Sequence, residues 1–330
     1  MALRKFDSRL IQSIWDGLEA GKTIKVKSSP FVIEFCKEQT GAEIIRFEFS
    51  VNFPLAAEAS TGFDIEIGHQ KDSTSLEVIR SNCDDDSMFT IFTSDLVALS
   101  TQCADLTQEE CANAVVDRIT AWQKFMKTAG RKLSDEKELG LLGELVVLQK
   151  WLQGGGKPKH LDAVWTGPIR QFNDFTFKRG YGFEVKTSTN ATPFRVHVDN
   201  LEQLDTGKLP NLSLVAIKVT ELPGGRTLLS LIDEINKQLP LKISQLEFMS
   251  KLISSGFNPE NPTRELREFR VDFIRAFKAD SVPRIIPGSI PGILSARYEM
   301  LLIGEDGRSV FGAEEQDFEA LLHRVITQGV

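Results

Sequence analysis

The chain has 330 residues, of which 41% are hydrophobic and 26% charged, close to the average for soluble globular proteins and unlike a disordered or fibrous chain. A single hydrophobic core usually stops growing before this length, so we expect two domains. The formal net charge of -7 argues against a protein that coats nucleic acid through charge alone.

The sequence carries no pattern typical of export or membrane insertion. No stretch approaches the roughly 18 consecutive apolar residues of a membrane span, and the first residues resemble an amphipathic helix rather than a signal peptide. The four cysteines form no CxxC pair and have no histidine placed to complete a zinc site; they are Cys36, Cys83, Cys103 and Cys111. We therefore expect a cytoplasmic protein with reduced thiols.

The N-terminal third alternates apolar and polar residues in short runs separated by turn-rich spacers, the pattern of half-buried strands. The predicted strands are Phe31 to Phe35, Ile44 to Phe49, Phe63 to Ile67, Leu76 to Ile79 and Met88 to Phe92. We interpret residues 1–105 as a β-rich N-terminal domain. Because this region is acidic, it is better suited to a partner or regulatory surface than to a DNA groove.

Two long helices are predicted next. Thr107 can cap a helix with apolar residues at helical spacing that runs towards Gly130. A second helix begins near Ser134, with acidic residues in its first turn, and ends before Gly154. The three glycines at 154–156 close this helix and lack a following GK[ST], so they predict a loop rather than a phosphate-binding site.

The remaining chain alternates strands and helices. Strands are predicted at 212–219, 269–277 and 297–303, and helices at 227–238 and 313–327. We therefore interpret residues 106–330 as an α/β domain. Residues 121–200 contain 13 basic and 8 acidic residues, a net charge of +5 within an acidic chain. Such a segment suits a phosphate-binding surface, although a solvated helix face would give the same count.

The segment FNDFTFKRGYGFEVKTST, residues 172–189, predicts two strands that each have an apolar and a polar face. If Lys178-Arg179-Gly180 is a three-residue hairpin loop with Gly180 in the left-handed conformation, Phe175 pairs with Phe183. Asp174 then falls directly opposite Glu184, at about 5 Å. Two carboxylates at that spacing repel each other, and a divalent cation would neutralise them.

Lys186 lies two residues beyond Glu184 on the same face, about 6.6 Å along the strand. Two carboxylates can hold Mg²⁺, while an ammonium group orients a water molecule and stabilises charge on an attacked phosphate. The combination predicts hydrolysis of phosphodiester bonds. The alternative for Glu184 and Lys186 alone is a structural salt bridge.

Glu144 provides a separate indication, because it lies within the apolar stripe of ELGLLGELVVLQKWL. A carboxylate there has to be paired, bound to metal or protonated. Gly140 and Gly143 would let this part of the helix approach a sheet closely, at some cost in helix propensity.

Glu144 on a helix, followed by Asp174 and then Glu184-Val185-Lys186 on adjoining strands, resembles the PD-(D/E)xK nuclease superfamily. GELVVLQKWL, TGP and FNDFTF…FEVKTS also resemble an uncharacterised prokaryotic family within it, found among restriction-like defence genes. The superfamily match covers about residues 134–205. Asn173 stands where the motif has a proline that is not a ligand.

The resemblance implies a restriction-endonuclease-like fold, with a mixed central sheet flanked by helices, and a Mg²⁺-dependent endodeoxyribonuclease in restriction or phage defence. It implies that Asp174, Glu184 and the Val185 carbonyl bind Mg²⁺, for which Mn²⁺ can substitute. Lys186 would position or deprotonate the attacking water, and Glu144 would reach the metal directly or through water.

Four further residues are candidate DNA contacts: Thr187, Ser188, Arg195 and His197. For all four the alternative is an ordinary exposed side chain. A second hypothesis keeps the fold but makes the chain a non-catalytic binding or assembly subunit of a defence complex. The expected partners are DNA, a motor ATPase or methyltransferase of the same system, and a second copy of the chain, with no membrane. A third hypothesis is that the chain is an unrelated soluble protein whose hairpin carries a salt bridge.

Overall fold

The computed structural model describes residues 8–27, 31–52, 63–80, 86–127, 133–167, 173–189, 193–240, 242–258, 267–310 and 312–328. The chain forms two compact units, each made from two separate lengths of chain. The first comprises Met1–Lys132 and Leu241–Pro262, and the second Leu133–Pro240 and Thr263–Val330. The division therefore lies at residue 132, not at the residue 105 that we expected from the sequence.

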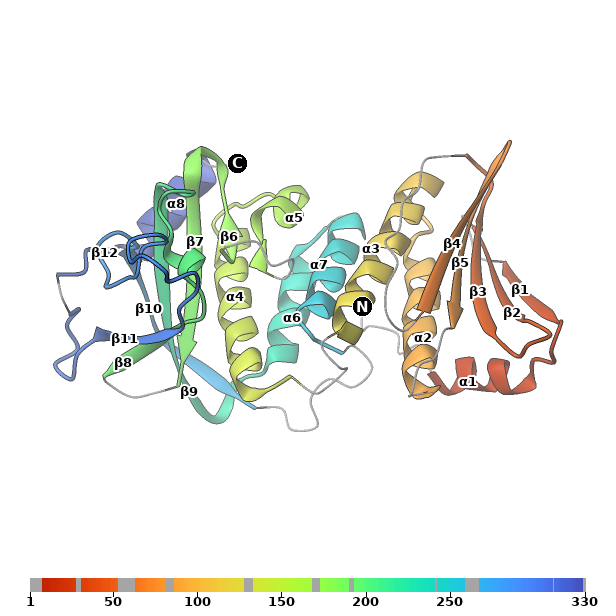
Figure 1. The fold of residues 1–330 in the computed structure, drawn as a ribbon, viewed down its shortest axis with the longest axis horizontal. Coiled ribbons are helices and arrows are strands. Elements are labelled where there is room, and N and C mark those ends of the chain that lie inside the picture. The colour runs from red at the N-terminus through yellow and green to blue at the C-terminus, as the bar shows by residue number, and fades with distance from the viewer. Residues whose placement is uncertain are drawn as a thin grey trace. The chain divides into compact units, whose positions relative to one another are not determined.

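The first unit contains an antiparallel sheet in the order β1-β2-β3-β5-β4 (Figure 1). Its strands are β1 (Thr23–Lys27), β2 (Val32–Lys37), β3 (Glu43–Phe49), β4 (Phe63–Gln70) and β5 (Ser73–Arg80). Its helices are α1 (Ser8–Gly17), α2 (Asp86–Gln102), α3 (Gln108–Lys127) and α7 (Lys242–Ser254). Alternate strand residues such as Ile45, Phe47 and Phe49 are buried in a core shared with the helices. The four predicted strands up to residue 80 are confirmed, and β1 was missed.

The predicted strand Met88 to Phe92 is wrong, because these residues lie in α2. Phe89, Phe92, Leu96 and Leu99 are all fully buried, a spacing that places them on one face of a helix. A five-residue window contained too few of them to distinguish this period from the alternation of a strand.

α3 belongs to the first unit because of its contacts. Thr107 and Glu110 cap it reciprocally, the Glu110 N–H donating to Thr107 Oγ1 at 3.2 Å and the Thr107 N–H to Glu110 Oε2 at 2.9 Å. The buried Arg118 guanidinium donates to Asp95 of α2 at 2.8 Å and to Ser250 of α7 at 3.1 Å. These bonds fix α2, α3 and α7 to one another, so the helix expected to begin the second domain lies within the first unit.

The second unit contains a five-stranded mixed sheet in the order β12-β10-β9-β7-β6. Its strands are β6 (Phe175–Thr176), β7 (Tyr181–Ser188), β9 (Asn211–Arg226), β10 (Phe269–Lys278) and β12 (Glu315–Gln316). β7 and β9 are parallel and the other neighbours antiparallel. β8 (Phe194–Val198) and β11 (Tyr298–Ile303) form a separate pair. The expected mixed sheet is confirmed, and β12 occupies residues that we predicted as helix.

The helices of this unit are α4 (Asp135–Gln153), α5 (Leu161–Val164), α6 (Leu228–Gln238) and α8 (Phe318–Gln328). Three 3-10 turns connect elements of this unit: η1 (Pro158–His160) joins α4 to α5, η3 (Lys178–Gly180) joins β6 to β7, and η4 (Leu201–Leu204) lies between β8 and β9. Ser134 and Thr227, near which helices were predicted to begin, cap α4 and α6. α4 packs on the β7 face that carries Val185 and Thr187. The β8–β11 pair shares a core with Leu214 and Ala216 of the opposite face.

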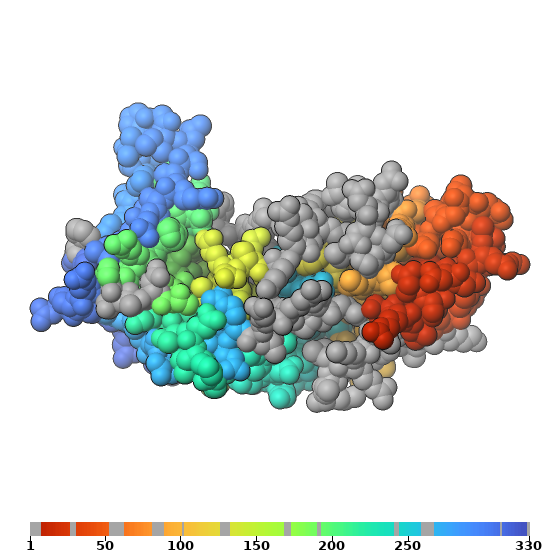
Figure 2. Space-filling view, turned by 90° about the horizontal axis from the view of Figure 1, so that it is seen from below, coloured from red at the N-terminus to blue at the C-terminus, as the bar shows by residue number. Residues whose placement is uncertain are grey.

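Between β10 and β11 the chain makes turns at Gly288 and Gly292, which both have a positive φ. This segment carries exposed apolar side chains, with Leu294 exposed to 93%. In the space-filling view it forms a blue lobe on the second unit (Figure 2). No helix among the described residues is long and apolar enough to cross a membrane.

Candidate active site

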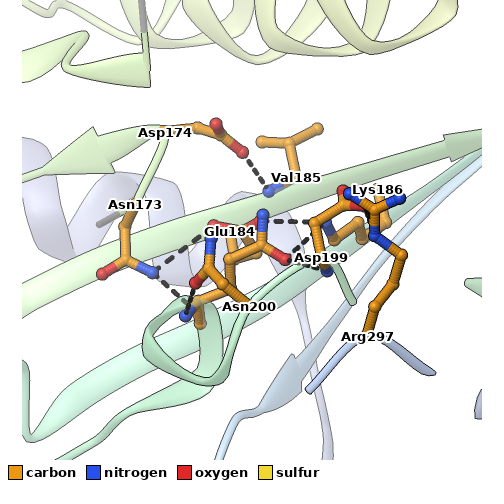
Figure 3. Close-up of polar contacts among 9 residues, drawn as sticks. Asn173, Asp174, Glu184, Val185, Lys186, Asp199, Asn200 and Arg297 are labelled. Atoms are coloured by element: carbon orange, nitrogen blue, oxygen red, sulfur yellow. Dashed lines mark hydrogen bonds and ion pairs between the residues drawn. The ribbon is translucent and has the colours of Figure 1, made fainter. Parts of the chain in front are cut away.

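The site lies where the short strand β6 separates from β7. Phe175 pairs with Phe183, and Gly180 has a φ of 72°, so the predicted hairpin register is confirmed. Upstream of Phe175 no described strand pairs with this edge of β7, and the Asp174 side chain takes that place: its Oδ2 accepts the Val185 N–H at 2.7 Å (Figure 3). A strand residue directs its N–H and C=O to the same side, so the Val185 carbonyl lies at this edge as well.

Glu184 and Lys186 lie on the face of β7 that is turned away from α4. Their parallel partners on β9 are Leu214 and Ala216, which belong to the core under β8 and β11. Glu184 is only 2% exposed, and its Oε1 lies 3.0 Å from Lys186 Nζ. The salt bridge that was the alternative interpretation of this pair is therefore formed.

Glu144 approaches the same edge from α4. An added Cβ at Gly143 would lie 1.8 Å from Thr187 Oγ1 and 3.3 Å from Val185 Cγ1, so only glycine allows this contact between helix and strand. The Trp165 indole N–H donates to Glu144 Oε2 at 2.7 Å. Glu144 is thus held beside β7. The Trp165 hydrogen bond gives this carboxylate a partner, which its place in the apolar stripe led us to expect.

Glu144 and Asp174 also meet at one glycine. A Cβ added at Gly167 would lie 2.7 Å from Glu144 Oε2 and 3.0 Å from Asp174 Oδ1. Only a residue without a side chain therefore fits beside these two carboxylate oxygens, which lie close to each other. A cation bound near both would be attracted by both charges.

Burial raises the pKa of all three carboxyl groups, and repulsion by Asp174 adds to this for Glu144 and Glu184. Burial, followed by the charge on Asp174, raises the pKa of Glu184 to about 8 and that of Glu144 well above its usual range. Burial also raises the pKa of Asp174, against the Val185 hydrogen bond and Lys186. For Lys186, burial works to lower the pKa, but Glu184 and Asp174 outweigh it and raise the pKa. Ionisation of all three carboxyls would therefore place more negative charge here than Lys186 alone can balance.

The donor atoms fit a hard divalent cation. Two carboxylates and a backbone carbonyl are the oxygen ligands that Mg²⁺ accepts, with waters completing its shell. Among the described residues no three acidic, histidine or cysteine side chains gather closely enough to hold a metal by themselves. Glu184 is engaged by Lys186 instead, so binding by all three carboxylates would require Glu184 to turn towards Asp174.

Residues 11–302 match the model of the family DUF4420, described as "Putative PD-(D/E)XK family member". This chain belongs to that family. No curated protein and no solved structure matches it. The match spans both compact units, so the first unit of this DUF4420 member is part of the family's common sequence.

A groove of about 470 Å³ adjoins the site of this PD-(D/E)XK family member. The end of β7 and the residue after it line one side, with Thr187, Ser188 and Thr189. The rest of the lining comes from His197 of β8, Asp199 directly after β8, Arg297, and Glu136 and Leu139 of α4. Three of the four candidate DNA contacts therefore line one groove. Arg195 is exposed and does not line the groove. Its Nη1 lies 3.7 Å from Glu299 Oε2, and His197 Nε2 lies 3.6 Å from Glu299 Oε1.

The sequence interpretation missed three residues of the site: Trp165, Gly167 and Gln203. Gln203 lies on η4, and its Oε1 is 3.0 Å from Lys186 Nζ. Asn200 caps η4, its side chain accepting the Gln203 N–H at 3.1 Å, and an asparagine cap is a recognisable sequence signal. No pattern in the sequence marks Gln203 or Trp165 themselves, because their role depends on contacts across the fold.

Proposed function

We propose that this protein is a Mg²⁺-dependent endodeoxyribonuclease that acts in restriction or phage defence, with Mn²⁺ able to replace Mg²⁺. The observation that supports this most is the approach of Glu144 Oε2 and Asp174 Oδ1 to the same residue, Gly167. The two oxygens meet beside the strand that carries Glu184 and Lys186. Acidic oxygens brought together, with an ammonium nearby, suit the hydrolysis of a phosphodiester.

In this proposal Asp174, Glu184, the Val185 carbonyl and Glu144 would hold the ion. When bound, Mg²⁺ supplies charge stabilisation for the phosphate and acidifies a water molecule. Lys186 orients the attacking water and stabilises the charge that develops on the phosphate oxygens. The Val185 N–H holds Asp174 Oδ2, and Asp174 Oδ1 stays close to Glu144 Oε2 beside Gly167.

DNA is the proposed substrate, and the groove beside Lys186 its proposed binding surface. Ser188 and His197 can donate hydrogen bonds to phosphate oxygens, and Arg195 and Arg297 can add charge-assisted contacts. The Thr187 hydroxyl is buried beside Gly143, so a contact between this group and DNA would require the side chain to turn. The acidic neighbours of the two arginines, Glu299 and Asp199, limit the net positive charge. We therefore expect moderate DNA affinity that depends on salt concentration.

The remaining proposals concern the cellular setting. The described thiols Cys36, Cys103 and Cys111 are free and buried, which is consistent with a reducing cytoplasm. We propose that the first unit is a partner or regulatory module, and that a motor ATPase or methyltransferase, or a second copy of the chain, works with the nuclease.

The test is cleavage of supercoiled plasmid, methylated and unmethylated, with Mg²⁺, Mn²⁺ or EDTA. Lys186→Ala should abolish cleavage, because nothing else in the described site can orient the water. Lys178→Ala, an exposed lysine on the hairpin turn, is the matched control and should cut normally. Undiminished cutting by Lys186→Ala would refute the assignment.

One observation favours the second hypothesis, a non-catalytic binding or assembly subunit. The Glu184–Lys186 ion pair is complete without any metal. Calorimetry with Mg²⁺ separates the two: no metal binding together with retained DNA or partner binding would favour the assembly role.

A further inference from the structure

Gln203 contacts two parts of the site at once. Its side-chain Oε1 accepts a hydrogen bond from Lys186 Nζ at 3.0 Å and a second from the Asp199 N–H at 2.9 Å. Its backbone carbonyl accepts Asn173 Nδ2 at 2.8 Å. Its own N–H is bound by Asn200 at 3.1 Å. The backbone N–H, the backbone C=O and the side-chain oxygen of Gln203 are therefore all used.

The donors fix the orientation of the amide. Lys186 Nζ and the Asp199 N–H can only donate, so the Gln203 atom between them has to be the oxygen. The Asp199 N–H belongs to the backbone at the end of β8 and holds this oxygen in place. The acceptor that Lys186 meets is consequently preorganised rather than a freely rotating side chain.

The position of Lys186 requires such an acceptor if Glu184 binds metal. In the structure the ammonium is shared between Glu184 and Gln203. When Glu184 turns towards a cation, the ion pair weakens, and the Gln203 oxygen remains to hold Lys186. A neutral amide does this without cancelling the positive charge that faces the phosphate.

Asn173 extends the same support to the carboxylates. It directly precedes Asp174 in the chain, and its Nδ2 lies 3.4 Å from Glu184 Oε2, a long contact, in addition to the bond with the Gln203 carbonyl. The side chain is 4% exposed, so it has little access to water as an alternative partner. Asn173 thereby ties the start of the hairpin to η4.

We propose that Gln203 is a positioning residue of this nuclease: it holds the Lys186 ammonium through its side chain and the segment of Asp174 through its main chain. The proposal rests on the proposed function for its catalytic consequence. Its structural part, an ordered Lys186 ammonium, does not depend on nuclease activity.

The first arm of the test is kinetic. Gln203→Met keeps the side-chain length but removes the acceptor, and should lower kcat by about 10- to 100-fold, the usual effect of losing a partner of an active-site group. KM for DNA and the affinity for Mg²⁺ should change little. Glu202→Met, on the same turn, is the matched control and should behave as the unmodified chain.

The second arm needs neither DNA nor metal. In protein with ¹⁵N-labelled lysine side chains, the Lys186 ammonium should give a protected NMR signal, identified by its loss in Lys186→Met. The signal should persist in Glu202→Met and in Gln203→Glu, which keeps an oxygen at this position, and disappear in Gln203→Met. A merely structural role for residue 203 would not distinguish its Glu and Met variants in this way.

The outcomes separate the two proposals. An unchanged signal and unchanged kcat in Gln203→Met would overturn the role of Gln203, as would loss of the signal in Gln203→Glu. If the unmodified chain cuts no DNA, the nuclease proposal fails, while the NMR arm still decides whether Gln203 orders Lys186. If Gln203→Met does not fold, Gln203→Ala, which also removes the acceptor, takes its place, and its signal is compared with that of Gln203→Glu.

Discussion

The Asp174 carboxylate accepts the backbone N–H of Val185 at 2.7 Å, in the place that a neighbouring strand would otherwise occupy. The Asp174 side chain thus completes the edge of β7 and brings its other carboxylate oxygen close to Glu144. The bond separates two contributions of Asp174, a hydrogen-bond acceptor and a negative charge, that substitutions can test individually.

Asp174→Asn keeps an acceptor for Val185 but removes the charge, whereas Asp174→Ala removes both. Without metal, the alanine variant should be less stable than the asparagine variant by about 1 kcal/mol, the usual contribution of such a bond. Both variants should lose the stabilisation that Mg²⁺ gives to the unmodified chain. Urea unfolding with EDTA or Mg²⁺ measures the differences, and equal stability of the two variants would contradict a role for the bond.

The raised pKa of Glu184 predicts how stability depends on pH. The pKa is about 8 in the folded chain and has an ordinary value of 4.5, so the folded state binds the proton more tightly. The metal-free protein should therefore lose stability as pH rises from 4.5 to about 8, by at most about 1.4 kcal/mol per pH unit from this group, and no further above that range.

Glu184→Gln is the control for this pH dependence, because it removes the titration of residue 184 and leaves the groups outside the site unchanged. Unfolding between pH 5 and 9 in EDTA should show a shallower decline for the variant. Mg²⁺ should reduce the decline in the unmodified chain, since a bound cation favours ionised carboxylates. Identical pH profiles for the two proteins in EDTA would show that Glu184 titrates normally.

Gly143 and Gly140 provide a matched pair on α4. Gly143→Ala places a methyl group 1.8 Å from Thr187 Oγ1, and the overpacking should cost about 1–3 kcal/mol and displace Glu144. Gly140→Ala meets nothing within 4 Å and should stabilise the helix by up to about 1 kcal/mol. Thermal unfolding measures the stability of the two variants, and plasmid cleavage measures the effect of displacing Glu144. Thr187→Ala should partly rescue Gly143→Ala, and destabilisation by Gly140→Ala to the same degree would contradict this explanation.

Trp165→Phe removes the indole donor from Glu144 while keeping an aromatic ring. This hydrogen bond works to lower the pKa of Glu144, so its loss should raise that pKa further and weaken Mg²⁺ binding at neutral pH. A bond to a charged group contributes about 1.5–3 kcal/mol, which corresponds to an affinity loss of roughly tenfold or more. Trp151→Phe is the control in calorimetry, because the buried indole nitrogen of Trp151 has no hydrogen-bond partner among the described residues.

The hairpin and the approach of Glu144 could be predicted from sequence because both follow from local rules. Gly180 fixes the turn, the turn fixes the register, and the register places Asp174 beside β7. A charged residue in an apolar helix stripe needs a partner, which predicted Glu144 as part of the site. The family match then agrees with the motif that these residues form.

Phe89 and Phe92 were assigned to a strand because the window was too short, and their helical period becomes clear only with Leu96 and Leu99. Long-range contacts account for the other features that the sequence could not predict. β12 has two residues and exists through pairing with β10. Gln203 meets Lys186 from 17 residues away, through a fold that brings η4 under β7. None of these has a local pattern from which to infer it.

The placement of α7 in the first unit has a consequence for protein synthesis. Its Leu246 and Ile253 complete a core that also contains Trp15 and Trp122, and its Ser250 binds Arg118. On the ribosome, this core has to wait until residues 242–254 emerge, by which time Glu144, Asp174, Glu184 and Lys186 have already been made. A chain that stops before α7 would leave its first unit unfinished, so the N-terminal unit depends on the synthesis of the nuclease motif that precedes α7.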